Sequence, residues 1–323
     1  MRRSASEKLE IIRIVQDSEL GAKRTLKELG INRSTFYQWY RSYLNDGFEG
    51  LKPKVPNRKT FWNKIPVQER NRVVEVALDR PELSPRELAF YITDNLGWFI
   101  SESSVYRILK ERGLITSPAW IVMAAADKFK DQPSYVHEQW QTDFTYFKVI
   151  GWGWYYLSTV MDDYSRYIIN WELCNNMETD DAERVVGDAV IAAGIGEDEL
   201  PRILTDHGPC YISKEFKRFI EEHGFIHVQG APYHPQTQGK IERYHRTMKN
   251  VVKLENYFFP DQLRAAIEAF VQHYNNERYH ESLGNLTPAD IYFGQDREIK
   301  IQRHLTKMKT LKERRKINRK LSA

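Results

Sequence analysis

Three acidic residues lie at positions in the sequence that favour a chemical role for a carboxylate. Asp143 lies between apolar neighbours in "WQTDFT", Asp206 ends the short apolar run "RILTD", and Glu242 lies near the start of a helical pattern in "GKIER". An unpaired charge within a strand is costly to bury, and the strand ends of α/β sheets are where ligands bind. Several Asp and Glu oxygens together suit Mg²⁺ or Mn²⁺, and two such ions can support phosphoryl transfer. These three residues form the candidate catalytic and metal-binding set.

Two basic residues follow Glu242 at helical spacing. Arg246 and Lys249 lie four and seven positions after it, so the three side chains share one face of a helix. Both bases can contact phosphate groups beside the acids. An ordinary solvated face, with bases paired to acids, is the alternative.

The elements that position the acids are predicted from the pattern after His137. Two β-rich runs, "EQWQTDFTYFKV" and "WYYLSTVMDDYSRYIINWEL", come first, and the second folds back as a hairpin at residues 163–165. Helices at 180–193, at 213–223 and from 239 onward then alternate with the strands "RILTD" and "FIHVQ". Antiparallel strands followed by β/α alternation predict an α/β fold with a mixed sheet flanked by helices.

Other acids and histidines have simpler explanations than a metal site. Asp162 and Asp163 open the hairpin turn, where Asp is favoured for local hydrogen bonds. His223 and His227 have ligand-like spacing, but no second pair completes them. A downstream segment is expected to serve packing or capping at least as readily as DNA contact; it contains Tyr274, Asn275, Arg278 and His280.

The N-terminal residues predict a helix-turn-helix domain. Leu9, Ile12 and Val15 mark a first helix, "AKRTLKELG" a second that ends at Gly30, and Ser34 opens a third. One face of the third helix is aromatic and consists of Phe36, Trp39, Tyr40 and Tyr43. Other side chains of this helix can reach base edges or phosphates, and these candidate DNA contacts are Thr35, Gln38 and Arg41. A generic three-helix bundle is the alternative.

A second helical unit follows the basic stretch "KPKVPNRK" at residues 52–59. Helices are expected at 67–78, 85–95 and 103–112, the second of them opened by a capping box of Ser84 and Glu87 around Pro85. The last helix is expected to bury Val105, Ile108 and Leu109. Its opposite side offers two further candidate DNA contacts, Arg107 and Lys110. A structural spacer is the alternative interpretation of this unit.

Charge is distributed unevenly along the 323 residues, whose net charge is +4. Residues 1–60 carry +6 and residues 297–323 carry +9, which leaves −11 for the middle. Basic ends around an acidic centre suggest a polyanion held at the edges and cations held in the middle, although charges can also merely solvate a surface. The basic tail is expected to stay disordered until DNA binds, with a fixed helix as the alternative.

Location and redox state follow from what the sequence lacks. Two cysteines, Cys174 and Cys210, cannot build a disulfide framework or a Cys-rich zinc site. The first residues contain no apolar signal region, and no run approaches the ~18 apolar residues that span a bilayer. A soluble protein of a reducing compartment is the expectation, and the resemblance of the strings around the three acids to a known family implies a bacterial cytoplasmic location at the nucleoid.

The strings around the three acids resemble a known catalytic core. Thirty-five residues separate Asp206 from Glu242, within "TDHG" and "HPQTQGKIE". This pattern resembles the D,D-35-E core of retroviral integrases and of DDE transposases of bacterial insertion sequences, from about His137 to Gly294, and includes "VMDDYSRYIINW" and "HYNNERYHESLGNLTPADIY". The tandem helix-turn-helix front end resembles the transposases, and the zinc-binding front end of retroviral integrases is absent.

The resemblance implies an RNase H-like mixed five-stranded sheet, preceded by all-α domains. Asp143 and Asp206 would lie on adjacent strands, with Glu242 brought over them by its helix and two Mg²⁺ or Mn²⁺ ions held between the acids. Lys249 matches the basic residue often found seven positions after the Glu. Residues 233–239 would form an active-site loop. The expected domains are 1–50, 64–117 and 137–295, joined by a linker (51–63) and a connector (118–136), with a tail at 296–323.

The implied activity is transposition. The chain would bind transposon ends in double-stranded DNA, cleave them with Mg²⁺ and transfer the freed strand to target DNA, as a homodimer or larger assembly. Two alternatives stay open: a catalytically inactive helix-turn-helix regulator derived from a transposase, and an RNase H-like nuclease.

Overall fold

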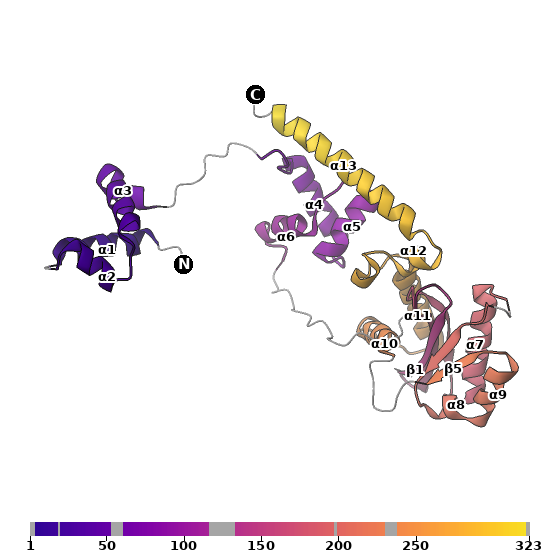
Figure 1. The fold of residues 1–323 in the computed structure, drawn as a ribbon. Coiled ribbons are helices and arrows are strands. Elements are labelled where there is room, and N and C mark those ends of the chain that lie inside the picture. Colours follow the sequence, from indigo (N-terminus) through magenta and orange to yellow (C-terminus); the bar gives the residue numbers. More distant parts are fainter. Residues whose placement is uncertain are drawn as a thin grey trace. The chain divides into compact units, whose positions relative to one another are not determined.

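A computed structural model describes residues 4–18, 20–52, 61–115, 133–196, 199–229 and 238–320. The chain divides into two units, one comprising Met1–Trp62 with Asn318–Ala323 and the other Asn63–Ile317. Figure 1 shows the elements in chain order. Most of the basic stretch at 52–59 and most of the connector lie outside the described residues.

The described N-terminal residues of the first unit form the helices α1 (Ala5–Asp17), α2 (Ala22–Glu28) and α3 (Arg33–Leu51). Ser4 caps α1 in a capping box with Glu7. Asn32, two residues before the predicted start at Ser34, caps α3 by accepting from Ser34 N–H. Gly30 has φ +61°, the left-handed conformation that ends a helix at low cost. The predicted aromatic face of α3 is confirmed, because Phe36, Trp39, Tyr40 and Tyr43 all pack into the core of this unit.

The second unit begins with α4 (Val67–Asp79), α5 (Pro85–Asn95) and α6 (Glu102–Glu111). The predicted capping box is confirmed, since Ser84 Oγ accepts from Glu87 N–H while the Glu87 carboxylate accepts from Ser84 N–H. The helices enclose an apolar core, and the predicted buried residues of α6 belong to it; they are Val105, Ile108 and Leu109.

The sheet has five strands in the order β3-β2-β1-β4-β5. β1 (Gln139–Val149), β2 (Gly153–Asp162) and β3 (Ile168–Cys174) pair antiparallel, while β4 (Arg202–Thr205) and β5 (Ile226–Gln229) extend the sheet in parallel from β1. The predicted mixed five-stranded sheet is therefore confirmed. β4 pairs with β1 only over Gln139–Gln141, so the β1–β2 hairpin extends well past the parallel strands.

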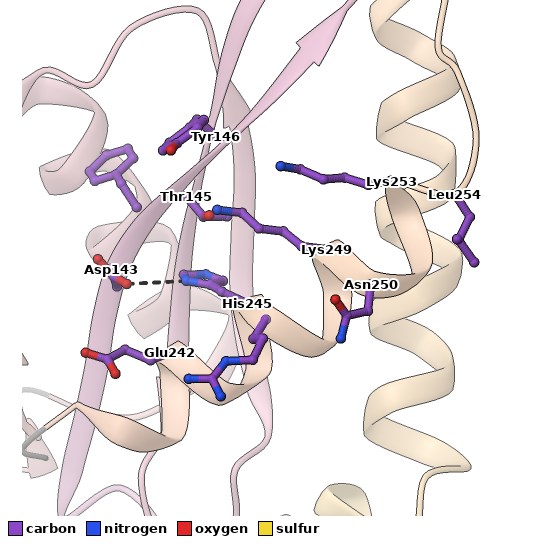
Figure 2. A pocket seen from close by; sticks show the side chains of 11 residues that line it. Asp143, Thr145, Tyr146, Glu242, His245, Lys249, Asn250, Lys253 and Leu254 are labelled. Carbon is purple, nitrogen blue, oxygen red and sulfur yellow. Dashed lines mark ion pairs between the residues drawn. The ribbon is translucent and has the colours of Figure 1, made fainter. Parts of the chain in front are cut away.

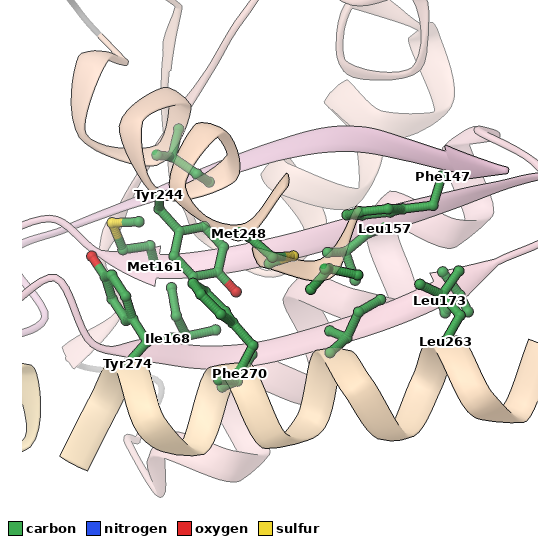
Figure 3. Packing of buried hydrophobic residues seen from close by; sticks show 14 of the residues in the cluster. Phe147, Leu157, Met161, Ile168, Leu173, Tyr244, Met248, Leu263, Phe270 and Tyr274 are labelled. Atoms are coloured by element: carbon green, nitrogen blue, oxygen red, sulfur yellow. The ribbon is translucent and has the colours of Figure 1, made fainter. Parts of the chain in front are cut away.

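Helices cover both faces of the sheet. On one face lie α10 (Gly239–Val252) and α11 (Pro260–Asn276), and on the other lie α7 (Thr179–Ala193), α8 (Pro209–Ile212) and α9 (Lys214–Glu222). Figure 3 shows how Phe147 and Leu157 of the sheet meet Met248 of α10 and Leu263 of α11. This packing fixes α10, and with it Glu242, against the strand that carries Asp143.

The predicted local hydrogen bonds of the hairpin acids are confirmed for Asp162, whereas Asp163 bonds to more distant residues. Asp162 accepts from both Ser165 N–H and Ser165 Oγ–H and from His137 N–H. Asp163 accepts from the side-chain amides of Gln139 and Gln141. Asp162 therefore holds the hairpin turn, whereas the Asp163 carboxylate bonds to side chains of β1.

The expectation of a disordered tail is wrong. Residues Asp296–Lys320 form one helix, α13, after the short helices η2 (Glu281–Leu283) and α12 (Pro288–Tyr292). Arg303 makes a two-pronged ion pair with Asp94 at 2.7 and 2.8 Å, and Arg314 donates to Glu69 and to the carbonyl of Phe99. The tail is ordered because its basic side chains meet acids and carbonyls of the α4–α6 unit. In the part of the chain that the structure describes, no helix combines the length and apolarity needed to cross a membrane.

Candidate active site

Asp143 lies in the middle of β1, opposite Thr159 of β2. Its side chain is 19% exposed, and its Oδ2 lies 3.3 Å from Nδ1 of His245 on α10. The other ring nitrogen of His245 lies 3.2 Å from the Thr159 hydroxyl. The carboxylate is therefore held on one side by a buried imidazole that is itself anchored to the neighbouring strand.

Asp206 follows directly after β4, the strand next to β1. Its Oδ1 accepts from Gly208 N–H at 2.8 Å, and a Cβ on Gly208 would lie only 2.9 Å from that oxygen. Partial burial raises the pKa of the Asp206 carboxyl; the Gly208 N–H opposes this shift, and the negative charge of Asp143 adds to it. Asp206 thus interacts electrostatically with Asp143.

Glu242 lies in the first turn of α10. Burial raises the pKa of its carboxyl, and the negative charge of Asp143 raises it further. The positive charge of Arg246 lowers this pKa, and the negative charge of Asp206 raises it. The structure therefore brings the three sequence-predicted acids into one electrostatic group, from β1, from the end of β4 and from α10.

The three carboxylates can be compared with a metal site in their donor atoms and in their arrangement. All donors are carboxylate oxygens, which suit Mg²⁺ or Mn²⁺. Within the described residues, no three His, Cys, Asp or Glu side chains form a group that could hold a metal ion as they stand. The donor chemistry fits a divalent cation.

A cleft of about 720 Å³ joins Asp143 and Glu242 to the basic side of α10. Figure 2 shows Asp143, Glu242 and His245 close together, with Lys249 and Lys253 projecting from α10 toward β1. Burial and the nearby Lys253 lower the pKa of Lys249. The predicted placement of Glu242, Arg246 and Lys249 along one helix face agrees with this cleft, which all three line.

The start of α10 is tied to the sheet by residues that the sequence interpretation did not select. Lys240 Nζ lies 2.7 Å from an Asp163 carboxylate oxygen and also donates to the Asp163 carbonyl. Ile241 N–H donates to the Gln141 side chain at 3.1 Å. These bonds fix the helix turn that carries Glu242.

His245 was also missed. It is 5% exposed and falls on the same helix face as Ile241, Tyr244 and Met248, which pack in the core. A lone histidine in an apolar stripe resembles a core residue in sequence. Its relation to Asp143 arises only when α10 is laid beside β1.

Several further candidates are explained by packing. His227 is within 2.8 Å of the Thr205 hydroxyl, and His223 contacts the Phe219 carbonyl. Asn275 both donates to and accepts from the backbone of Ile168. Tyr274 is buried in the core beside α10. The structure gives these residues structural partners.

The candidate DNA contacts lie on separate units. Gln38 and Arg41 are exposed on α3 and Thr35 is half-buried there, while Arg107 and Lys110 are exposed on α6. Most of the predicted loop at 233–239 lies outside the described residues.

Comparison with known proteins assigns domains along the chain. Residues 133–235 and 223–288 match two families, each described as an integrase core domain. Residues 7–59 match a helix-turn-helix domain and residues 35–109 a homeodomain-like domain.

Two similar individual proteins come from a retrovirus and from mouse. The chain is 37% identical to the Gag-Pro-Pol polyprotein of squirrel monkey retrovirus over 115 residues, or 35% of this chain and 6% of the polyprotein. It is 50% identical to a mouse IgE-binding protein over 50 residues, or 15% of this chain and 9% of that protein. The matched stretches thus span less than a tenth of these relatives.

Two structures show a weaker likeness. The HTLV-2 integrase catalytic core domain in complex with magnesium is 22% identical, with a TM-score of 0.40, over 49% of this chain and 97% of that one. A chain of the simian T-cell lymphotropic virus intasome is 18% identical, with a TM-score of 0.43, over 68% of this chain and 74% of that one.

Proposed function

We propose that this chain, in which helix-turn-helix domains precede an integrase core domain, is a DNA transposase of the insertion-sequence type. It would act as a polynucleotidyl transferase: water cleaves a phosphodiester bond at a transposon end, and the released 3′-hydroxyl then attacks a phosphodiester of target DNA. The helix-turn-helix units would bind the terminal inverted repeats. Joining two DNA ends requires a homodimer or a larger assembly.

The observation that carries this proposal is the electrostatic group of Asp143, Asp206 and Glu242. These three residues would hold two Mg²⁺ or Mn²⁺ ions, which, when bound, supply activation of the attacking oxygen and stabilisation of the leaving oxygen. Neighbouring carboxylates repel one another when ionised, and a divalent cation between them would offset this repulsion, since opposite charge favours the ionised form.

The protein's own side chains would position the DNA and the acids. Arg246 and Lys249 line the cleft beside the acids, where each can bind a phosphate of the strand to be cut. His245 would orient Asp143 through its contact at 3.3 Å. Residues that contact a metal-binding side chain, without binding the metal themselves, commonly have this role.

The proposal is tested by cleavage of a supercoiled plasmid that carries the element's ends, taken from the DNA that flanks the gene. Wild-type protein should nick it with Mg²⁺ or Mn²⁺ and not with chelator. Asp206→Asn should reduce nicking by at least about 10³-fold, because a carboxylate ligand is replaced by a neutral amide. Asp188→Asn, an exposed acid of α7, is the matched control and should nick normally.

The alternatives give different results. Cleavage that survives Asp206→Asn would refute the proposed site. An inactive regulator would bind the flanking duplex and never nick it. An RNase H-like nuclease would cut the RNA strand of an RNA:DNA hybrid and would not bind the flanking duplex DNA.

A further inference from the structure

The β1–β2 hairpin exposes large aromatic rings past the end of the parallel strands. Tyr146 is 51% exposed, Trp154 51% and Trp152, in the turn, 59%. Tyr146 and Trp154 meet edge to face, with ring centroids 5.4 Å apart. Exposed aromatic surface of this size, gathered at one place, commonly marks a binding surface.

Lysines are interleaved with these rings. Lys249 Nζ lies 4.5 Å from the Tyr146 ring centroid and Lys253 Nζ lies 6.0 Å from it. Lys148 Nζ lies 5.9 Å from the Trp154 ring centroid. These five residues, Tyr146, Lys148, Trp154, Lys249 and Lys253, form what we call the aromatic–lysine surface.

Part of the aromatic–lysine surface lies in the candidate active site. Tyr146, Lys249 and Lys253 line the same cleft as Asp143 and Glu242, and Figure 2 shows the two lysines directed from α10 toward Tyr146 on β1. A strand with its backbone beside the acids would therefore reach Tyr146, whose ring meets that of Trp154.

We propose that the aromatic–lysine surface binds unpaired nucleotides of the DNA strand that enters the candidate active site. Bases would stack on Tyr146 and Trp154, and the three lysines would contact the adjoining phosphates. Flat rings combined with cations are how proteins bind single strands. In an intact duplex the base faces are covered by neighbouring pairs, which leaves exposed rings without a stacking partner.

Charge favours nucleic acid over a protein partner at this place. The aromatic–lysine surface contains three lysines and no acid, and lysine is depleted in the cores of protein interfaces. The inference rests on the proposed function for its choice of DNA. It adds that the DNA end is locally melted when it is bound.

The test measures binding of the full-length chain to three labelled oligonucleotides by fluorescence anisotropy, without divalent cations. The probes are a duplex, the same duplex with five unpaired terminal nucleotides on one strand, and the single strand alone. Tyr146→Leu and Trp154→Leu should each weaken binding to the two unpaired probes about tenfold, the size of one lost base stack. Binding to the duplex should change less than about twofold, because duplex affinity comes mainly from phosphate contacts.

Two controls separate stacking from other effects. Tyr146→Phe keeps the ring and should retain wild-type binding to all probes. Tyr135→Leu removes a tyrosine that is 62% exposed and does not line the cleft, and it should also behave as wild type.

Equal weakening on all three probes, or no weakening on the unpaired ones, would overturn the inference. So would a change in oligomeric state by sedimentation with unaltered DNA binding, which would identify a protein interface. Plasmid nicking by the same preparations separates the two proposals. If nicking depends on Asp206 but Tyr146→Leu does not weaken binding to the unpaired probes, only the proposed stacking surface is refuted. If Tyr146→Leu weakens binding to the unpaired probes selectively but the wild-type protein does not nick the plasmid, only the proposed transposase function is refuted.

Discussion

At the scale of single residues, His245 is in direct contact with one of the candidate acids, Asp143. It links Thr159 of β2 to Asp143 of β1. We expect His245→Ala to reduce plasmid nicking and to raise the Mn²⁺ concentration for half-maximal nicking, each by about 10- to 100-fold, as loss of an outer partner of a metal ligand commonly does. His245→Asn retains a donor near the Nδ1 position and should recover part of both losses.

A purely structural histidine would give a different pattern. His245→Ala would then lower the unfolding temperature and the amount of active protein, while the Mn²⁺ concentration for half-maximal nicking stayed at the wild-type value. Direct Mn²⁺ titration by calorimetry, which requires no DNA, distinguishes the two.

His280 predicts a pH dependence of stability. Burial, helped by the positive charges of Arg166 and Arg278, lowers the pKa of His280 to about 3. In the unfolded chain His280 takes up a proton near pH 6.5, whereas in the folded chain it does so only near pH 3. The unfolding free energy therefore falls as the pH decreases from about 6.5 to about 3. The slope from this group is about 1.4 kcal/mol per pH unit.

The measurement is urea unfolding between pH 6 and pH 4.5. His280→Gln removes the titrating group and should make the pH dependence shallower than that of wild type by about 1 kcal/mol per pH unit. The same change at His304, exposed on α13, is the matched control. Identical slopes for His280→Gln and wild type would contradict the assignment.

At the scale of elements, α13 depends on polar contacts with the α4–α6 unit. Arg314 is 4% exposed, and its guanidinium donates to Glu69 and to the Phe99 carbonyl. Arg314→Ala leaves these acceptors without a charged donor and should lower the unfolding free energy by about 2 kcal/mol. Lys316→Ala, an exposed base of the same helix, should change it by less than about 0.5 kcal/mol.

Hydrogen exchange checks the same contacts by element. Amide protons of α4 and α13 should exchange faster in Arg314→Ala, and those of the sheet should not. Fast exchange along α13 already in wild type would instead support the original expectation of a disordered tail.

Elements whose signals are local were predictable from sequence. The capping box at Ser84 and Glu87 is contained in four residues, and strand alternation in β1 reflects one face packed on α10. The tail was mispredicted because its helix has few apolar residues, and its order comes from partners such as Asp94 and Glu69 that lie more than 200 positions away.

The candidate site divides in the same way. The three acids were selected because carboxylates among apolar residues are conspicuous in sequence, and family-like strings surround them. His245 and Tyr146 were not selected, since one resembles a core residue and the other an ordinary strand aromatic. Their relation to Asp143 and Lys249 depends on how α10 crosses β1, which no local pattern encodes.

At the scale of the whole molecule, the proposed function places duplex recognition in the N-terminal helices and chemistry in the α/β core. This division predicts that changes on α3 alter DNA affinity without altering the cleavage step. Arg41 is exposed on α3 and is the clearest place to test it, because its guanidinium can bind either a phosphate or the edge of a guanine.

We expect Arg41→Ala to weaken binding to duplex from the flanking DNA and to reduce the slope of log affinity against log salt by about 0.9, the value for one lost phosphate contact. Arg41→Lys keeps the charge and should restore the slope. If Arg41 also contacts a base, Arg41→Lys will still lose about tenfold in preference for the flanking sequence over random duplex, since lysine lacks the planar fork. Nicking at saturating protein should match wild type for both variants. Unchanged salt slopes for both would place Arg41 away from DNA, and a slower nicking rate at saturation would show that α3 and the core do not act separately.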